Sequence, residues 1–370
     1  VTVGMGMTER QGGSDVRANM TEAGPADGSG SGVAYVISGH KWFLSAPMSD
    51  AFLILAQAKG GLSCFLLPRV LPNGALNGLT LVRLKDKLGN CFNASAEVEF
   101  DRALGFLVGE EGRGIATIID MVTFTRLDFG VSCAGLMRQA LACAIHHAQH
   151  RTAFQRGLVD QPLMGRVLAD MALDAEAATA LVFRLAHAFD GASDADTAYR
   201  RLMTPVTKYW ICKIAPPLIT EAMECMGGNG YVEEGGFPRL YREAPVNAIW
   251  EGAGNIMALD VLRVLERSPE VLDRVLAELA ELAPGERRLK AALERLKGLA
   301  GETKRDPSGA RALVELLALT HAGALLNAHA PPAVTDAFFA TRLRGTWRHT
   351  NGAAPADTAS IVRRAAPVLD

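Results

Sequence analysis

The sequence lacks the features that would place it quickly in a membrane, nucleotide-binding or protease class. None of its apolar runs reaches the roughly eighteen uninterrupted residues that a membrane-spanning helix needs. No charged segment followed by an apolar stretch opens the chain, as it would in a signal peptide. The motifs GK[ST] and HExxH are absent, and neither Gly4-Met5-Gly6 nor GAGNIM completes a GxGxxG motif. The sequence therefore gives no indication of a P-loop, a zinc-protease site or a Rossmann fold.

Cysteine spacing and net charge exclude further classes. The six cysteines form neither a CxxC pair nor a zinc-ligand pattern, which predicts reduced thiols, a cytoplasmic protein and no metal site. His146, His147 and His150 could bind a metal at helical spacing, but histidines at a helix end more often bind the last backbone carbonyls. The formal net charge of -2 offers no general attraction for nucleic acid.

The first 108 residues have the pattern of a β domain. Short apolar or alternating runs are separated by Gly, Asn and Pro, which predicts antiparallel strands. AFLILAQA and LSCFLLPRV flank Lys59-Gly60-Gly61, a hairpin signal because glycine accepts the positive φ of tight turns. AEVEF, at residues 96–100, is expected to be the last strand. The chain starts at Val1 within an apparent strand, so we expect this domain to be truncated at its start.

From Ile115 the apolar spacing lengthens towards 3.6 residues, which predicts a four-helix bundle over residues 109–267. The first helix should end near the histidine cluster, and Pro162 suits the first turn of the second, which should stop at Gly191. The third should span residues 197–226, with a break or kink at Pro216-Pro217. The fourth should begin near Asn255 as its N-cap. The composition of residues 268–370 predicts a separate C-terminal helical extension. Because a β domain is followed by helices along the chain, the expected fold class is α+β.

Glu251 is the acid whose neighbours suit chemistry best. Ile249 and Trp250 are apolar on one side, and Gly252 and Gly254 on the other leave the backbone bare before a helix. Such a loop would bring backbone N–H groups close to a ligand, and the apolar flank would raise the pKa of the carboxyl towards that of a general base. From the spacing alone, a solvated surface glutamate remains the commoner alternative.

Four segments, taken together, resemble acyl-CoA dehydrogenases. TERQGGSDV, at residues 8–16, resembles the family's TEPxAGSD stretch, and GHKWFLS, at residues 39–45, its GxKxWIT segment. MGGNGYVEE, at residues 226–234, resembles the GGxGY turn, and LYREAPVNAIWEGAGNIM resembles the RDAxxxxIYEGTxxI signature. Each motif alone is weak, but four in the family's order over residues 1–265 are specific.

The resemblance implies FAD chemistry in which Glu251 removes the α-proton of an acyl-CoA thioester. In one branch of the family the base instead precedes an arginine on the first bundle helix. Here Thr125 precedes Arg126, so that alternative position holds no acid. Phe43 stands where many members have Trp. Gln155 replaces the glycine of the family's RxxFG motif, which begins here at Arg151. Glu224 stands where a glutamine that contacts FAD is common. These departures predict a cofactor site with altered contacts.

Carried over by position, the resemblance also implies the cofactor contacts. Phe43 would face the isoalloxazine, and residues 252–256 would line FAD through backbone atoms. Arg151 would reach the FAD pyrophosphate of a neighbouring subunit in a homotetramer, with Gln161 as a nearby polar contact. Thr8, Ser14 and Ser45 would lie near both flavin and substrate. The full implied set is Met5, Gly6, Met7, Thr8, Glu9, Arg10, Gln11, Gly12, Gly13, Ser14, Phe43, Leu44, Ser45, Arg151, Gln161, Asn247, Ala248, Ile249, Trp250, Gly252, Ala253, Gly254, Asn255, Ile256 and Met257.

Within the family, several phrases resemble the AidB branch, flavoproteins of the adaptive response to alkylating agents, with weak dehydrogenase activity and an extra C-terminal helical domain associated with DNA. Arg342, Arg344 and Arg348 cluster in TRLRGTWRH, as phosphate binding to double-stranded DNA would require. Clustered arginines at helix ends more often form a solvated face. Two alternatives therefore stay open: an ordinary acyl-CoA dehydrogenase without DNA binding, and an acyl-CoA oxidase that passes electrons to oxygen.

Overall fold

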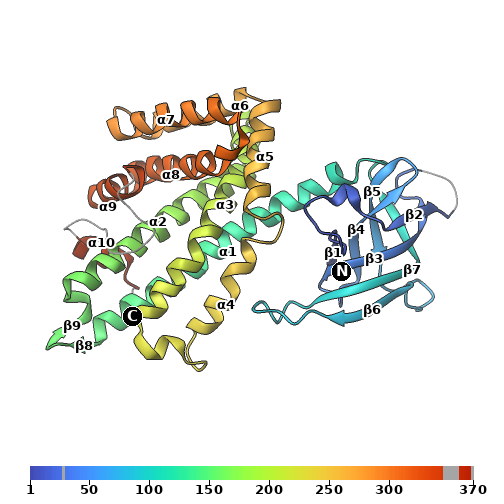
Figure 1. Cartoon of the computed structure of the whole chain (residues 1–370), viewed down its shortest axis with the longest axis horizontal. Helices are drawn as coiled ribbons and strands as arrows, with labels where there is room; N and C mark the ends of the chain where they lie inside the picture. Colours follow the sequence, from blue (N-terminus) through green and yellow to red (C-terminus); the bar gives the residue numbers. More distant parts are fainter. Residues whose placement is uncertain (27–29, 345–357, 368–370) are drawn as a thin grey trace. The chain divides into compact units, whose positions relative to one another are not determined.

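The computed structural model describes residues 1–26, 30–344 and 358–367, and it divides into two compact units. The first unit comprises Val1–Phe124 and contains a seven-stranded sheet, and the second comprises Thr125–Asp370 and is mainly helical (Figure 1). The predicted α+β class is confirmed. Helix α1 (Gly114–His150) begins in the first unit and continues in the second.

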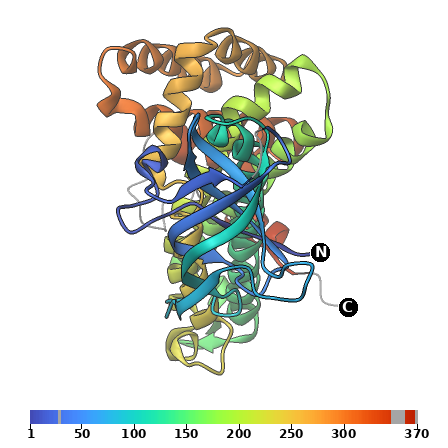
Figure 2. The ribbon, with the colours of Figure 1, turned by 90° about the vertical axis from the view of Figure 1, so that its right-hand side faces the viewer.

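The first unit is a seven-stranded sheet that closes on itself. Its strands are β1 (Val3–Gly6), β2 (Glu22–Pro25), β3 (Ala34–Ser45), β4 (Ala51–Ala58), β5 (Gly61–Pro68), β6 (Leu79–Leu84) and β7 (Ser95–Val108), with the 3-10 helix η1 (Val16–Ala18) after β1. The order is β1-β3-β2-β4-β5-β7-β6, and a further pairing of β3 with β7 completes a ring. The pairing is antiparallel except where β1 and, at one position, β2 run parallel to β4. Figure 2 shows the strands inclined to one another, as in twisted sheets.

The predicted hairpin is confirmed in the first unit. Strands β4 and β5 pair antiparallel with Ala58 opposite Gly61, and Gly61 has a φ of 112°. Strand β7 starts where AEVEF was expected but runs on to Val108, because its far half pairs with both β3 and β5. Tyr35, Phe52 and Phe65 are fully buried inside the sheet, and each such side chain contributes roughly 1.5–3 kcal/mol to folding.

The second unit is built from long helices that share one core. They are α2 (Pro162–Asp190), α3 (Asp194–Cys225), α4 (Phe237–Asn247), α5 (Gly254–Arg267), α6 (Glu270–Leu282), α7 (Arg287–Thr303), α8 (Ala310–His329), α9 (Pro332–Phe338) and α10 (Thr358–Ala365), besides α1. Short elements connect them: strands β8 (Thr152–Ala153) and β9 (Arg156–Gly157), 3-10 helices η2 (Leu158–Asp160), η3 (Gly227–Tyr231) and η4 (Pro307–Gly309), and the π-helix η5 (Phe339–Leu343). Within this unit α2 packs against α3, α8 packs on both of them, and α7 lies on α8 (Figure 1).

The helix predictions are confirmed at several positions and corrected at others. Helix α1 ends at His150, Pro162 starts α2 and Gly191 caps it, as expected. Helix α3 runs without interruption through Pro216 and Pro217, so the chain does not break there; its extensive buried face offsets the lost hydrogen bonds. Helix α4 was not predicted. The N-cap of α5 is Ala253, because the Asn255 side chain accepts a hydrogen bond from Arg311 instead.

The helices after Ser268 pack into the same core as the bundle. Leu313, Leu317 and Phe338 are fully buried in the cluster that contains Leu181 and Tyr199 of α2 and α3. The segment Pro307–His329 is long and apolar enough to cross a membrane by length and composition alone. However, 72% of its most apolar window is buried within the protein, which is typical of a core helix.

Candidate active site

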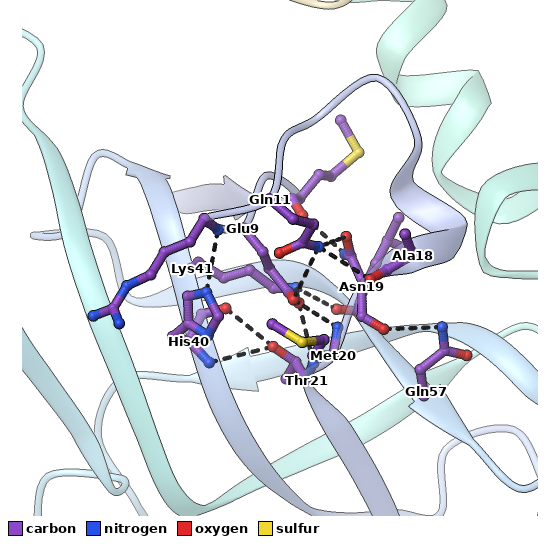
Figure 3. A network of polar contacts seen from close by, with 12 residues as sticks. Glu9, Gln11, Ala18, Asn19, Met20, Thr21, His40, Lys41 and Gln57 are labelled. Atoms are coloured by element: carbon purple, nitrogen blue, oxygen red, sulfur yellow. Dashed lines mark hydrogen bonds and ion pairs between the residues drawn. The ribbon is translucent and has the colours of Figure 1, made fainter.

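A buried ion pair holds the loop of residues 8–14 in the first unit. Lys41 Nζ lies 2.7 Å from Glu9 Oε1 and donates a second hydrogen bond to the carbonyl of Leu55, also at 2.7 Å. The other Glu9 oxygen accepts a bond from the backbone N–H of Met20 at 2.6 Å, and both partners of the pair have side chains with 0% exposure (Figure 3). These contacts lower the pKa of Glu9 to about 2, although burial alone would raise it.

The carboxylate of Glu9 accepts hydrogen bonds from Lys41 and from the backbone N–H groups of Met20 and Thr21, so it fixes the loop that precedes Ser14. A predicted cofactor contact at Glu9 is therefore left to its backbone. Gln11 binds the same network through the carbonyl of Ala18 at 3.1 Å (Figure 3). At Gly13 any β-carbon would lie 2.4 Å from Thr8 Oγ1, so only glycine fits there. The loop keeps its exposed backbone available to a ligand.

The remaining predicted residues of this unit divide into exposed and buried groups. Arg10, Ser14 and Phe43 are exposed, and Lys85 Nζ lies 4.6 Å from the Phe43 ring centroid. Thr8, Gly12 and Ser45 are half-buried. Leu44 is fully buried, so it could meet a ligand only through its backbone. Gly6 is buried against Leu44, and the half-buried Met5 and Met7 pack on a small apolar cluster around Leu55.

Glu251 lies in the second unit, in the loop between α4 and α5. It has a φ of 54°, an unusual value for a residue with a side chain, and Gly252 follows with a φ of 103°. Within the described part of the chain, its buried Oε2 has no hydrogen-bond partner. Burial raises the pKa of this carboxyl above its usual value of 4.5, while Arg126 and Lys208 oppose the rise. The half-buried carboxyl combines the raised pKa and free oxygen that a general base needs.

Three consecutive carbonyls around Glu251 are bound by two cations. Lys208 Nζ donates to the carbonyl of Trp250 at 2.7 Å and to that of Gly252 at 2.6 Å. Arg126 Nε donates to the carbonyl of Glu251 at 3.0 Å, and its Nη1 pairs with Asp260 of α5 at 2.7 Å. Lys208 was not predicted from the sequence, where its only signal is a lysine among the apolar residues of α3.

The other predicted residues of this loop differ in exposure. Ile249, Ala253 and Asn255 are exposed, and Ala248, Trp250 and Ile256 are half-buried. Asn247, Gly254 and Met257 are buried. The Trp250 ring lies 5.5 Å from that of Phe129 on α1, which gives the loop an apolar side. Lys208 takes one of the two lone pairs of the Gly252 carbonyl oxygen.

The predicted pyrophosphate contacts lie at a hairpin after α1. Arg151 is exposed and precedes β8, and Gln161 Nε2 donates to the carbonyl of Ala153 at 3.1 Å. At the hairpin tip Phe154 and Gln155 both have positive φ values, and Phe154 is 95% exposed. Gln161 thus braces the hairpin from within, while Arg151 and Phe154 face away from this chain's core.

The arginine cluster predicted for DNA is corrected in part. Arg342 is buried and pairs with Asp170 at 2.6 Å and with Asp174 at 2.9 Å, so its predicted phosphate contact is wrong. Arg344 is exposed, and Arg348 lies outside the described residues. Arg344 lines a cavity of about 800 Å³ with Arg287, Arg288 and Arg295.

Neither the cysteines nor the histidines form a metal centre in the part of the chain that the structure describes. All six cysteines are free thiols, and no group of three or more His, Cys, Asp or Glu side chains there could hold an ion. At the end of α1, His150 Nδ1 lies 2.8 Å from the carbonyl of His146, the backbone contact expected from a histidine-rich helix end.

Comparison with known proteins gives consistent matches. A family model described as acyl-CoA dehydrogenase, middle domain, matches residues 4–103, and one described as acyl-CoA dehydrogenase, C-terminal domain, matches residues 112–266. The chain is 49% identical to the putative acyl-CoA dehydrogenase AidB of Escherichia coli over 91% of its length. It is 35% identical to acyl-CoA dehydrogenase family member 11 of Caenorhabditis elegans over 89% of its length. It spans 61% and 58% of these two relatives.

A solved structure supports the same assignment. Caenorhabditis elegans ACDH-11, in complex with C11-CoA, superposes with a TM-score of 0.85 and is 32% identical in sequence. The match covers 94% of this chain and 65% of the other.

Proposed function

The chain belongs to the acyl-CoA dehydrogenase family, and on that premise we propose that Glu251 is the base that removes the α-proton of an acyl-CoA thioester. The observation that carries this proposal is the unpaired, buried Oε2 of Glu251 in a loop with an apolar flank. A carboxyl with a raised pKa and a free oxygen can accept a proton at neutral pH, whereas a carboxylate bound by cations, such as Glu9, cannot.

The proposed cofactor is FAD, which when bound supplies the acceptor for the β-hydride. The residues present fit such a group: Gly12 and Gly13 carry no side chain that would keep a ligand from the backbone, Thr8 and Ser14 add hydroxyls, and Phe43 presents an exposed ring. Residues 253–256 would add backbone contacts, and Arg151 would add a positive charge for the pyrophosphate. Every residue predicted for the cofactor stays in this set, with Glu9 contributing only its backbone.

The proposed substrate is a short or branched acyl-CoA. Trp250, which packs against Phe129, would exclude water beside the base, and this keeps the proton affinity of Glu251 high. Thr8, Ser14 and Ser45 would place polar groups near the thioester. The Caenorhabditis elegans structure holds an acyl-CoA of the same chemical class, which supports a thioester substrate but does not fix the acyl chain.

The test is anaerobic reduction of the FAD-loaded, full-length protein by isovaleryl-CoA, followed as loss of flavin absorbance. We expect the wild type to bleach and Glu251→Gln to bind FAD yet bleach at least a hundredfold more slowly. Glu266→Gln on the exposed face of α5 is the matched control. Equal bleaching by wild type and Glu251→Gln would overturn the role of Glu251. Hydrogen peroxide formed in air at the rate of substrate loss would instead identify an oxidase.

A second proposed function is binding of double-stranded DNA, as the AidB-like sequence suggests. The observation that favours it is the cavity of about 800 Å³ lined by Arg287, Arg288, Arg295 and Arg344. Arg288 is neutralised by Glu286 and Asp336, but Arg287 and Arg344 are exposed. We expect Arg287→Glu/Arg344→Glu to weaken a salt-dependent DNA shift, and Lys297→Glu on the same helix to leave it unchanged. If the wild-type protein does not shift DNA even at low salt, DNA binding is contradicted and the alternative of an ordinary acyl-CoA dehydrogenase remains.

We also propose a cytoplasmic homotetramer. The exposed Arg151 and Phe154 at the hairpin tip suit contact with another subunit, because they face away from the core of their own chain. Light scattering of the purified protein, with Phe154→Ser as the variant, measures this assembly. A monomeric wild type would contradict it.

A further inference from the structure

Lys208 is a buried cation in the second unit whose hydrogen bonds go to the backbone around Glu251. Its side chain projects from the middle of α3, and the residue is 1% exposed. Its ammonium donates to the carbonyls of Trp250 and Gly252, at 2.7 and 2.6 Å. Lysine on a buried helix face is costly, because an ammonium loses its hydration there.

The burial of Lys208 is not explained by an ion pair, because its hydrogen bonds to the described residues go to carbonyls and not to a carboxylate. Burial lowers the pKa of Lys208 to about 8, and Cys212, Glu251 and Cys133 nearby offset this only in part. Arg126 adds a like charge nearby, which lowers the pKa further. A methionine or leucine would fill the same space without this cost, so the ammonium must act through the two carbonyls.

The two carbonyls lie on either side of Glu251. Holding the carbonyls of residues 250 and 252 fixes the peptide planes before and after that residue, and Arg126 fixes the carbonyl of Glu251 itself. The φ of 54° at Glu251 lies in the left-handed region, which typically costs of order 1–3 kcal/mol for a non-glycine residue and persists only when its surroundings impose it. The three cation–carbonyl bonds are the contacts that impose it.

We propose that Lys208 is a positioning residue that holds the Glu251 loop in its left-handed conformation, in which one oxygen of the Glu251 carboxyl is free. This inference rests on the proposed role of Glu251 as base. Arg126 is the second member of this carbonyl clamp, but it also pairs with Asp260, so its replacement would disturb α5 as well. Lys208 is therefore the residue to test.

The first measurement needs neither substrate nor cofactor. Hydrogen exchange of the flavin-free protein, read by mass spectrometry on peptides spanning residues 248–254, reports the order of the loop. We expect Lys208→Met to raise exchange there at least tenfold. The matched control is Arg201→Met, which removes an exposed positive charge from the same helix. Lys208→Gln, which keeps a neutral N–H donor, should lie between Lys208→Met and wild type, and it serves in place of the Met variant if that does not fold.

The second measurement separates a positioning role from a merely structural one. In the FAD-loaded protein we expect Lys208→Met to lower kcat at least tenfold with little change in KM, because the base is displaced and not the binding surface. The acidic limb of the kcat/KM profile should also move to higher pH, since Lys208 no longer lowers the pKa of Glu251. Arg201→Met should show neither effect.

The outcomes distinguish this inference from the proposed function. Unchanged exchange at residues 248–254 in Lys208→Met overturns the clamp, whatever the activity. Raised exchange with unchanged kcat and pH profile overturns the positioning role. If wild-type protein does not turn over any acyl-CoA, the proposed function of Glu251 fails while the exchange data still decide whether Lys208 orders the loop.

Discussion

Lys41 and Glu9 form an ion pair of 2.7 Å inside the first unit, with both side chains fully buried. Lys208 of the second unit is also buried, but in the described part of the chain its hydrogen bonds go to the carbonyls of Trp250 and Gly252. Each of the two lysines thus holds one loop within its own unit. The difference is that Lys41 neutralises a carboxylate, whereas Lys208 leaves the Glu251 carboxyl free.

Removing either partner of the Glu9–Lys41 pair should destabilise the first unit. Glu9→Gln or Lys41→Met leaves an uncompensated buried charge, and we expect each to cost about 3–5 kcal/mol in urea unfolding. The double variant should cost much less than the sum, because no lone charge remains. Glu99→Gln, which removes the exposed 4.0 Å pair with Arg10, is the control and should change stability by less than about 0.5 kcal/mol. Additive single effects would contradict the pairing.

The Glu9–Lys41 pair should also make the stability of the protein depend on pH in the acidic range. The pKa of Glu9 is about 2 in the folded protein against 4.5 normally, so its stabilising contribution is complete above pH 4.5 and is lost between 4.5 and about 2. The melting temperature of the wild type should therefore fall more steeply over that interval than that of Glu9→Gln/Lys41→Met. Parallel curves for the two proteins would show that Glu9 does not carry the acid sensitivity.

The sequence sufficed to predict features that depend on local pattern. The turn at Gly61 and the start of α2 at Pro162 each follow from a few neighbouring residues. Glu251 was singled out because four motifs together resemble one family, since its own neighbours are also compatible with a surface glutamate. Helix α4 was missed because it has only 11 residues and contains Pro238 and Pro245, which normally indicate a break.

Features that depend on distant partners could not be predicted. Arg342 was expected on the surface because other arginines follow it, yet Asp170 and Asp174, on α2, bury it. Glu9 belongs to a motif associated with a cofactor, but Lys41 and the backbone of residues 20–21 take its oxygens. In both cases the charge is visible in the sequence, whereas the partner that neutralises it is set by the fold.

Glu251→Gln should stabilise the protein while abolishing its chemistry. Because burial raises the folded-state pKa of Glu251 above 4.5, the ionised carboxyl destabilises the fold; this penalty is absent below pH 4.5 and complete above the raised pKa. A neutral amide avoids it. We therefore expect a higher melting temperature than wild type at pH 8 and no difference at pH 4. A lower melting temperature at pH 8 would mean that Lys208 and Arg126 stabilise the carboxylate more than burial penalises it.

Arg151→Met should weaken FAD binding without unfolding the protein. The guanidinium is exposed on the hairpin after α1 and would lose a charge-assisted contact with pyrophosphate worth roughly 1.5–3 kcal/mol, or about ten- to a hundredfold in Kd. Fluorescence quenching of free FAD on titration with protein measures this. Arg156→Met, in the same hairpin, is the control. An equal loss in both variants would indicate general electrostatic attraction instead of a specific contact.

Arg342 and Arg344 are two residues apart, but replacing them should affect the stability of the protein very differently. Arg342→Met leaves Asp170 and Asp174 buried without their cation, so we expect a loss of about 3–5 kcal/mol in urea unfolding. Arg344→Met removes an exposed charge and should leave stability within about 0.5 kcal/mol of wild type. If the cavity beside Arg344 binds DNA, Arg344→Met should also reduce the slope of log affinity against log salt by about one.

The conservative change Arg342→Lys tests the geometry of this buried site. Lysine keeps the charge but cannot donate to Asp170 and both oxygens of Asp174 at once, as the guanidinium does. It should therefore recover only part of the lost stability. Full recovery would mean that charge alone holds α2 to η5. A stable Arg342→Met that has lost DNA binding would contradict the buried pairing and return Arg342 to the phosphate-binding role that the sequence suggested.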